Sequence, residues 1–197
     1  MTPTRRFAAL AGLLLSISPI CVHAQTAAPL TPELAAKVET CAACHGEDGL
    51  PVKEEAPIIW GQEFYYLYVQ MRDFQAGRRE NEIMQGIVEG LSKDDMKAIA
   101  QHFTDKKWPD ISYQATPEEE RRAEQAAVAG QCTQCHLGAY TGNSRVPRVA
   151  GQNVKYLEKT MLDFKYDRRK NMPDMASLLR TMPDEDVIAL SRFAAAK

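Results

Sequence analysis

The stretch CAACHGEDG at residues 41–49 places two cysteines and a histidine within five positions, and CTQCH at residues 132–136 repeats the arrangement. Cysteine and histidine at this spacing serve three chemistries, namely a zinc site, a reducible disulfide and a covalently attached haem. The sequence around the two clusters distinguishes between them.

The clusters belong to an internal repeat. Cys41 recurs at Cys132 (132 − 41 = 91), and the segment PIIWGQEFYYLYVQMRDFQAGRREN from Pro57 corresponds to PRVAGQNVKYLEKTMLDFKYDRRKN from Pro147 (147 − 57 = 90). The paired positions include Gly61/Gly151, Gln62/Gln152, Tyr66/Tyr156, Phe74/Phe164, Arg78/Arg168 and Asn81/Asn171. Helical periodicity matches apolar positions but does not generate such a run of Pro, Gly, Gln, Arg and Asn, so the chain contains one unit twice.

Both units are predicted to be helical bundles. Capping residues precede runs of apolar residues at three- and four-residue spacing, and long alternating strand patterns are absent. These signals predict helices from Thr31 into Cys41, over 62–76 and from Ser92 to Phe103, and, in the second unit, from Thr116, over 154–167 and over 184–195. The predicted fold class is therefore all-α.

The first 24 residues have the pattern of a cleaved signal peptide. Arg5 and Arg6 precede an apolar run over 7–20, and Val22-His23-Ala24 offers small residues where a signal peptidase would cut. The run is too short for a membrane-spanning helix. We therefore expect an exported protein that is soluble in the periplasm, an oxidising compartment.

The remaining chain divides into a predicted first domain over 25–108, a linker over 109–115 and a second domain over 116–197. Each domain keeps a long segment without helical pattern after its cysteine cluster, over 46–60 and 137–150. Loops of that length usually serve a function or wrap around something, and domains this small have little core of their own.

The charge balance excludes one class of partner. Without Arg5 and Arg6 the 24 basic residues become 22 against 26 acidic ones, a net charge of −4. This gives no reason to expect nucleic acid as a partner. Residues 25–108 hold 9 basic and 14 acidic side chains and residues 109–197 hold 13 and 12, an asymmetry that either steers protein partners or is an uneven solvated surface.

Covalent haem fits the two clusters best. Zinc takes four ligands, and one cluster supplies at most three, so the clusters would have to share an ion or recruit His102. A thioredoxin-type disulfide needs a βαβ setting, which helical patterns do not provide. Cys-x-x-Cys-His is the attachment signature of haem c. We expect two covalently bound haem c groups and no other metal, with Cys41, Cys44, Cys132 and Cys135 as anchors and His45 and His136 as iron ligands.

A methionine follows each histidine at the same distance, Met84 after His45 (84 − 45 = 39) and Met175 after His136 (175 − 136 = 39). Methionine opposite histidine is the ligation that raises the iron potential in electron-carrying cytochromes. It also fills the coordination position that catalysis would need. Met84 and Met175 are the predicted sixth ligands, and Met172 is the alternative in the second unit.

Other residues are candidates for a supporting role. Pro57 and Pro147 lie 12 and 11 residues after their histidines, where a backbone carbonyl would accept the imidazole N–H; ordinary loop prolines are the alternative. The paired arginines are expected to face water, with contact to haem propionates as the alternative: Arg78, Arg79, Arg168 and Arg169.

Both units resemble class I cytochromes c, and their tandem arrangement resembles the cytochrome c4 family over nearly all of the chain after residue 24. The motifs are CAACHGEDG, the segment WGQEFYYLYVQMRDFQAGRRENEIM with GLSKDD, and VAGQNVKYLEKTMLDFKYDRRKN. The resemblance implies two all-helical domains, each around one His/Met haem. The sequence departs from the family pattern in the second unit, which reads HLGAY after the cysteines and MPDED in place of LSKDD.

The function expected from this resemblance is single-electron transfer. Its donor would be a dehydrogenase or quinol-oxidising complex and its acceptor a terminal oxidase or another protein, with membrane association only through those partners. RRKNMPDMASLLR also resembles the di-haem subunit of flavocytochrome c sulfide dehydrogenases, so an electron-accepting subunit of an oxidoreductase is the alternative. A catalytic haem protein would require an open iron position.

Overall fold

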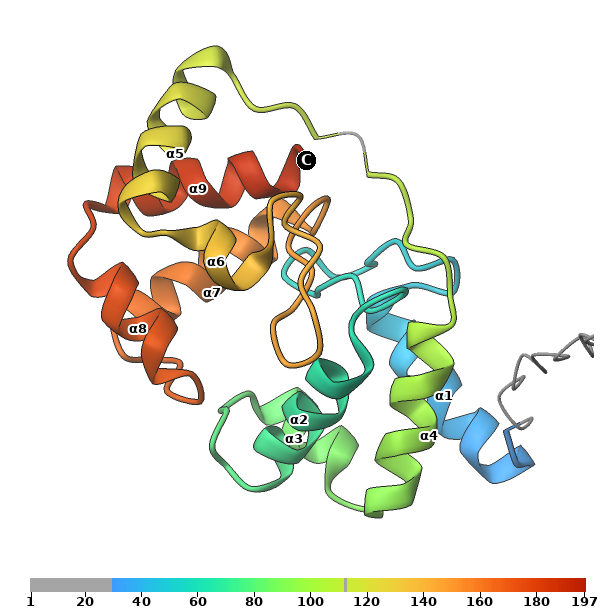
Figure 1. Cartoon of the computed structure of the whole chain (residues 1–197). Coiled ribbons are helices and arrows are strands. Elements are labelled where there is room, and N and C mark those ends of the chain that lie inside the picture. The colour runs from blue at the N-terminus through green and yellow to red at the C-terminus, as the bar shows by residue number, and fades with distance from the viewer. Residues whose placement is uncertain (1–29, 112) are drawn as a thin grey trace, which may run out of the picture.

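The computed structural model describes residues 30–111 and 113–197, which form two groups of helices joined by an extended segment (Figure 1). The first repeat contains α1 (Pro32–His45), α2 (Phe64–Gln75), α3 (Glu82–Val88) and α4 (Lys93–Thr104). The second contains α5 (Pro117–Ala129), α6 (Cys132–His136), α7 (Val154–Lys165), α8 (Pro173–Arg180) and α9 (Asp184–Ala195). The described residues include one isolated β-bridge but no strand, so the all-α prediction is confirmed. The predicted signal peptide lies outside the described residues.

The predicted helix starts are confirmed by their caps. The Thr31 hydroxyl accepts a hydrogen bond from the Leu34 amide at the start of α1. Reciprocal capping boxes begin α4, through Ser92 and Asp95, and α5, through Thr116 and Glu119. Each box satisfies two amide groups that a helix start would otherwise leave unpaired.

The middle helices are shorter than predicted, and the chain turns after each of them through a residue in the left-handed region, Gly77 (φ 67°) or Asp167 (φ 55°). The turn leads into α3 or α8, short helices that the sequence did not predict and that carry Met84 and Met175. In the second repeat, Gln131 (φ 53°) also separates α6 from α5, whereas α1 is continuous through its cysteines.

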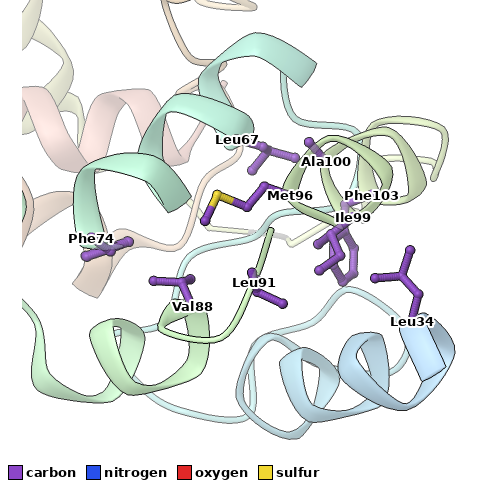
Figure 2. Close-up of a cluster of buried hydrophobic side chains, with 9 residues drawn as sticks. All are labelled: Leu34, Leu67, Phe74, Val88, Leu91, Met96, Ile99, Ala100 and Phe103. Atoms are coloured by element: carbon purple, nitrogen blue, oxygen red, sulfur yellow. The ribbon is translucent and has the colours of Figure 1, made fainter. Parts of the chain in front are cut away.

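Apolar side chains from all four helices form the core of the first repeat (Figure 2). Met96 on α4 is fully buried in this core and packs with Leu67 and Phe74 of α2 and Val88 of α3. In the second repeat the buried apolar residues form three smaller clusters, around Ala123, Phe164 and Leu157. The first repeat therefore has one continuous apolar core, whereas the core of the second repeat is divided.

The loops that follow α1 and α6 lie between the two helix groups (Figure 1). Trp108, the last residue of the predicted first domain, contacts the second repeat: its indole donates to the Gly151 carbonyl (3.3 Å) and the Arg148 guanidinium lies 4.6 Å from its ring centroid. The proposed boundaries at 108/109 and 115/116 stay predictions. None of the helices in the described ranges is long and apolar enough to cross a membrane.

Candidate functional site

The first cysteine cluster occupies the last turns of α1. Cys41 and Cys44 are three residues apart, which places both thiols on one side of the helix, and His45 is its last residue. Gly46 then turns the chain with φ 89°. An added Cβ at this position would overlap the Leu50 carbonyl oxygen, so the residue after His45 must be glycine for the loop to fold back so closely.

His45 is buried, and its ring orientation is fixed by one hydrogen bond. Its Nδ1 lies 2.8 Å from the Pro57 carbonyl oxygen. A carbonyl only accepts, so Nδ1 carries the proton and Nε2 keeps its lone pair. Burial lowers the pKa of His45, the bond to Pro57 opposes this, and the Arg79 charge lowers it further. The side chain is therefore a neutral imidazole with a free nitrogen, the form that binds metals.

The second cluster has the same arrangement on a different helix. Cys132 and Cys135 lie on α6, and Nδ1 of His136 is 3.0 Å from the Pro147 carbonyl oxygen. Burial lowers the pKa of His136, again opposed by its carbonyl partner. The predicted role of the two proline carbonyls is thus confirmed in both repeats. Leu137 takes the place of Gly46 and also has a positive φ, 64°.

Burial disfavours the thiolate form of one cysteine in each cluster. The four described cysteines are unpaired. Burial raises the pKa of Cys41 to about 11 and also raises that of Cys132, whereas redox and metal-binding thiols have lowered values. Within the described residues, no group of three or more His, Cys, Asp and Glu side chains is placed to hold a metal ion.

Met84 and Met175 occupy the same helical position. Met84 is the third residue of α3, after the cap Asn81, whose side chain accepts from the Met84 amide (3.0 Å). Met175 is the third residue of α8, and the N-cap before that helix is Met172. By place in the helix, Met172 therefore corresponds to Asn81 and not to Met84.

The chain was compared with known proteins, and no protein-family profile matches it. Cytochrome c4 from Pseudomonas aeruginosa is 32% identical over 168 residues, which cover 80% of this chain and 84% of that protein. The crystal structure of reduced recombinant cytochrome c4 from Pseudomonas stutzeri has a TM-score of 0.75 at 28% identity and covers 86% of this chain and 99% of that one.

The chain belongs to the cytochrome c4 family.

Membership of the cytochrome c4 family gives the two clusters their cofactor. The chain carries two covalently bound haem c groups, in two class I cytochrome c domains, and its function is electron transfer. Another relative, the "thiosulfate dehydrogenase electron acceptor" of Stutzerimonas stutzeri strain A1501, is 31% identical over 167 residues and covers 79% of this chain and 77% of that protein.

The residues around the clusters fit a porphyrin. In the first repeat, Cys41, Trp60 and Met84 all pack against the same buried apolar cluster. In the second, Cys132 borders the cluster around Ala123, and Met175 borders the one around Phe164. Each half of this cytochrome c4 chain thus combines a thiol pair and an imidazole nitrogen with apolar walls, which suits a covalently attached haem.

The interface between the domains of this cytochrome c4 chain holds a buried polar cluster that the sequence did not predict. Arg79 donates to the Tyr156 hydroxyl (3.1 Å), and Arg169 donates to the Tyr66 hydroxyl (3.4 Å). Gln70 accepts from both arginines at 2.9 Å. The prediction that the arginines face water is wrong for Arg169, which is only 7% exposed. The positions of these two arginines were recognised as repeat-related, but their contacts across the interface were not predicted.

The charges of Arg79 and Arg169 also change the pKa values of the half-buried Tyr66 and Tyr156. Burial raises the pKa of Tyr66. Burial alone would raise the pKa of Tyr156 as well, but the neighbouring Arg79 and Arg169 charges outweigh it and lower the value to about 7. Two guanidinium groups at the interface therefore favour the ionised form of the Tyr156 hydroxyl. By contrast, Arg78 and Arg168 are exposed, as predicted.

Proposed function

We propose that this cytochrome c4 chain carries single electrons in the periplasm and that each repeat holds its iron between a histidine and a methionine. His45 with Met84, and His136 with Met175, would ligate the two irons. The thioether anchors are Cys41, Cys44, Cys132 and Cys135.

The observation that carries the ligand assignment is the state of the two histidines. In each, Nδ1 lies within hydrogen-bond distance of a proline carbonyl oxygen, which can only accept, so Nε2 is the nitrogen left to bind a metal. In metalloproteins a ligating histidine usually donates its other nitrogen in this way. The equal helical positions of Met84 and Met175 support the second half of the assignment.

Bound haem supplies the one-electron Fe(II)/Fe(III) couple. The protein holds it, tunes it and limits access to it. The proline carbonyls orient the imidazoles, and the methionines fill the position where an exogenous ligand or substrate would otherwise bind. The apolar residues around Cys41 and Met84 exclude water from the first site. Such an arrangement favours electron transfer over chemistry at the iron.

Optical spectroscopy of methionine variants tests the ligands. In the reference protein we expect two low-spin centres, each with the weak sulfur-to-iron band near the red end of the spectrum. Met84→Ala and Met175→Ala should each remove this band from one centre. Met172→Ala is the matched control, and loss of the band in that variant in place of Met175→Ala would reassign the second ligand.

The export proposal rests on residues 1–24 and is tested by mass spectrometry of the purified protein. The chain should begin at Gln25 and carry the added mass of two porphyrins. A retained N-terminus would refute cleavage, and a single porphyrin would refute the two-site assignment.

The partner proposal has two forms. In the first, the chain is a free carrier between a dehydrogenase or quinol-oxidising complex and a terminal acceptor. In the second, it is the dedicated electron acceptor of an oxidoreductase, and the relative named as a thiosulfate dehydrogenase electron acceptor favours a thiosulfate-oxidising enzyme over the flavin-dependent sulfide dehydrogenase suggested by the sequence. The rate of haem reduction, measured by stopped-flow spectroscopy, distinguishes the two forms. A dedicated acceptor is reduced much faster by thiosulfate with its dehydrogenase than by unrelated donors, whereas a general carrier is reduced at similar rates by both.

A further inference from the structure

One peptide group in each repeat is hydrogen-bonded on both sides. The carbonyl of the peptide that joins Pro57 to Ile58 accepts from Nδ1 of His45 (2.8 Å). The N–H of the same peptide donates to Oε1 of Gln152, on the other repeat, at 2.6 Å. A continuous chain of hydrogen bonds therefore runs from the histidine of the first repeat to a side chain of the second.

The second repeat has the equivalent arrangement, with the roles of the two repeats exchanged. The carbonyl of the peptide that joins Pro147 to Arg148 accepts from Nδ1 of His136 (3.0 Å), and its N–H donates to Oε1 of Gln62 at 2.8 Å. Gln62 and Gln152 are themselves repeat-related positions. Each glutamine therefore reaches across the interface to the peptide that orients the other repeat's histidine.

Both glutamines are rigidly held. Gln62 and Gln152 are each 2% exposed. Their amide nitrogens donate across the interface as well, Gln152 to the Ile58 carbonyl and Gln62 to the Arg148 carbonyl, both at 2.9 Å. Each Oε1 also accepts the amide N–H of the residue after its own glutamine. A buried primary amide with this many partners has one orientation.

We propose that Gln152 and Gln62 are positioning residues that set the reduction potential of the haem in the opposite repeat; this rests on the proposed role of His45 and His136 as iron ligands. The glutamine oxygen polarises the peptide N–H, and hydrogen bonds in a chain strengthen one another. The peptide carbonyl becomes a stronger acceptor for Nδ1–H. The imidazole gains anionic character, which stabilises oxidised iron and lowers the potential.

The direction of the effect follows. Removing a glutamine weakens the proline carbonyl of the opposite repeat as a hydrogen-bond acceptor. The reduction potential of the haem in that opposite repeat should therefore rise, and the potential of the haem in the glutamine's own repeat should not change. The structure thus makes the potential of each haem depend on contact with the neighbouring domain. A domain freed from its neighbour would expose the same peptide N–H to water.

The test compares Gln152→Leu with Gln62→Leu in the complete haem-bearing protein, by redox titration with the two centres assigned through Met84→Ala and Met175→Ala. Gln152→Leu should raise the potential of the first-repeat haem only, and Gln62→Leu that of the second only. In the same variants, exchange of the Ile58 amide or the Arg148 amide, respectively, should accelerate, and the Nδ1–H resonance of the corresponding histidine should move.

Asn153→Ala is the matched control, because the Asn153 side chain also bonds across the interface, to the Glu54 and Ala56 carbonyls (2.8 and 2.9 Å), but bonds to neither of the two peptide groups, and the main-chain N–H of Asn153 is unchanged by the substitution. It should leave both potentials unchanged. If the control shifts them as much as the glutamine variants do, or if Gln152→Leu moves both haems equally, loosening of the interface explains the result and the proposal is wrong.

Two further measurements keep the test decisive. If Gln152→Leu does not fold, Gln152→Met removes the amide at similar length, and an unshifted first-repeat potential in that variant overturns the proposal. The optical band of the methionine variants reports the iron ligands independently. Intact bands with unchanged potentials would leave the proposed function standing and refute the glutamine effect alone.

Discussion

Gly46 follows His45 at the end of α1, and alanine at this position tests whether the backbone there fixes the first haem site. The φ of 89° is unfavourable for any residue with a Cβ, at a cost of about 1–3 kcal/mol. The new methyl group would also overlap the Leu50 carbonyl oxygen and lie 2.7 Å from its carbon, both main-chain atoms that cannot rotate away. Overpacking of this kind adds about 1–3 kcal/mol.

Together these costs predict that Gly46→Ala lowers the free energy of unfolding by about 2–6 kcal/mol, a large part of the roughly 5–15 kcal/mol that stabilises a typical domain. Relief of the overlap would shift His45, so we also expect a weaker sulfur-to-iron band in the first repeat. Urea unfolding followed by circular dichroism measures the first effect, and a lower midpoint at unchanged slope is the expected form.

Gly86→Ala is the matched control for this prediction. Gly86 is exposed within α3, and no atom lies within 4 Å of an added Cβ. The same substitution should therefore stabilise the protein by about 1 kcal/mol, since alanine is the better helix former. If Gly46→Ala unfolds at the same urea concentration as the parent protein, the conformation described for this turn is incorrect.

Three other outcomes are expected. Leu137→Gly should stabilise the second repeat by about 1 kcal/mol, because it relieves a leucine held at φ 64°; an unchanged urea midpoint would contradict this. Arg169→Met should loosen the contact between the domains and cost about 2–4 kcal/mol, because it removes the donor to the Thr160 and Tyr66 hydroxyls and buries no replacement, whereas the exposed Lys170→Ala should change stability by less than about 0.5 kcal/mol; X-ray scattering and urea unfolding measure both. Burial alone would raise the pKa of Asp163, but Lys159 and Arg168 lower it, so the carboxylate stabilises the fold above its unfolded-state pKa and this stability is lost as pH falls through the lower folded-state value. Asp163→Asn should make the free energy of unfolding depend less on pH in the acid range. If the variant and the parent protein lose stability equally as pH falls, the ion pairs of Asp163 with Lys159 and Arg168 are not the cause of that loss.

Local signals in the sequence were sufficient for most of the fold. Capping residues such as Thr31 and Ser92 predicted helix starts because they act on amides within three residues along the chain. The helix over 184–195 was predicted with its observed bounds. The short helices α3 and α8 were missed, since seven or eight residues hold too few turns to show a period.

The candidate haem-binding residues could be proposed for a similar reason, because the cysteine and histidine spacing is a local motif. The Pro57 carbonyl was identified as a candidate acceptor for His45 from its distance along the chain, and the structure places it there. The contacts between the repeats were not predictable. Gln152 was visible as a repeat-related residue, but its position along the chain does not indicate that it bonds to Ile58 of the other repeat.

The equivalence of Gln62 and Gln152 gives the interface the geometry of a two-fold homodimer contained in one polypeptide. In a true homodimer, any substitution appears on both sides at once, and the two sites remain identical. Here the two halves are encoded separately, and the cross-contacts use the main chain of Ile58 and Arg148, so those side chains are free to differ. A symmetrical interface can therefore serve two haems of unequal reduction potential, because substitution of a residue in one half changes the potential of the haem in the other half.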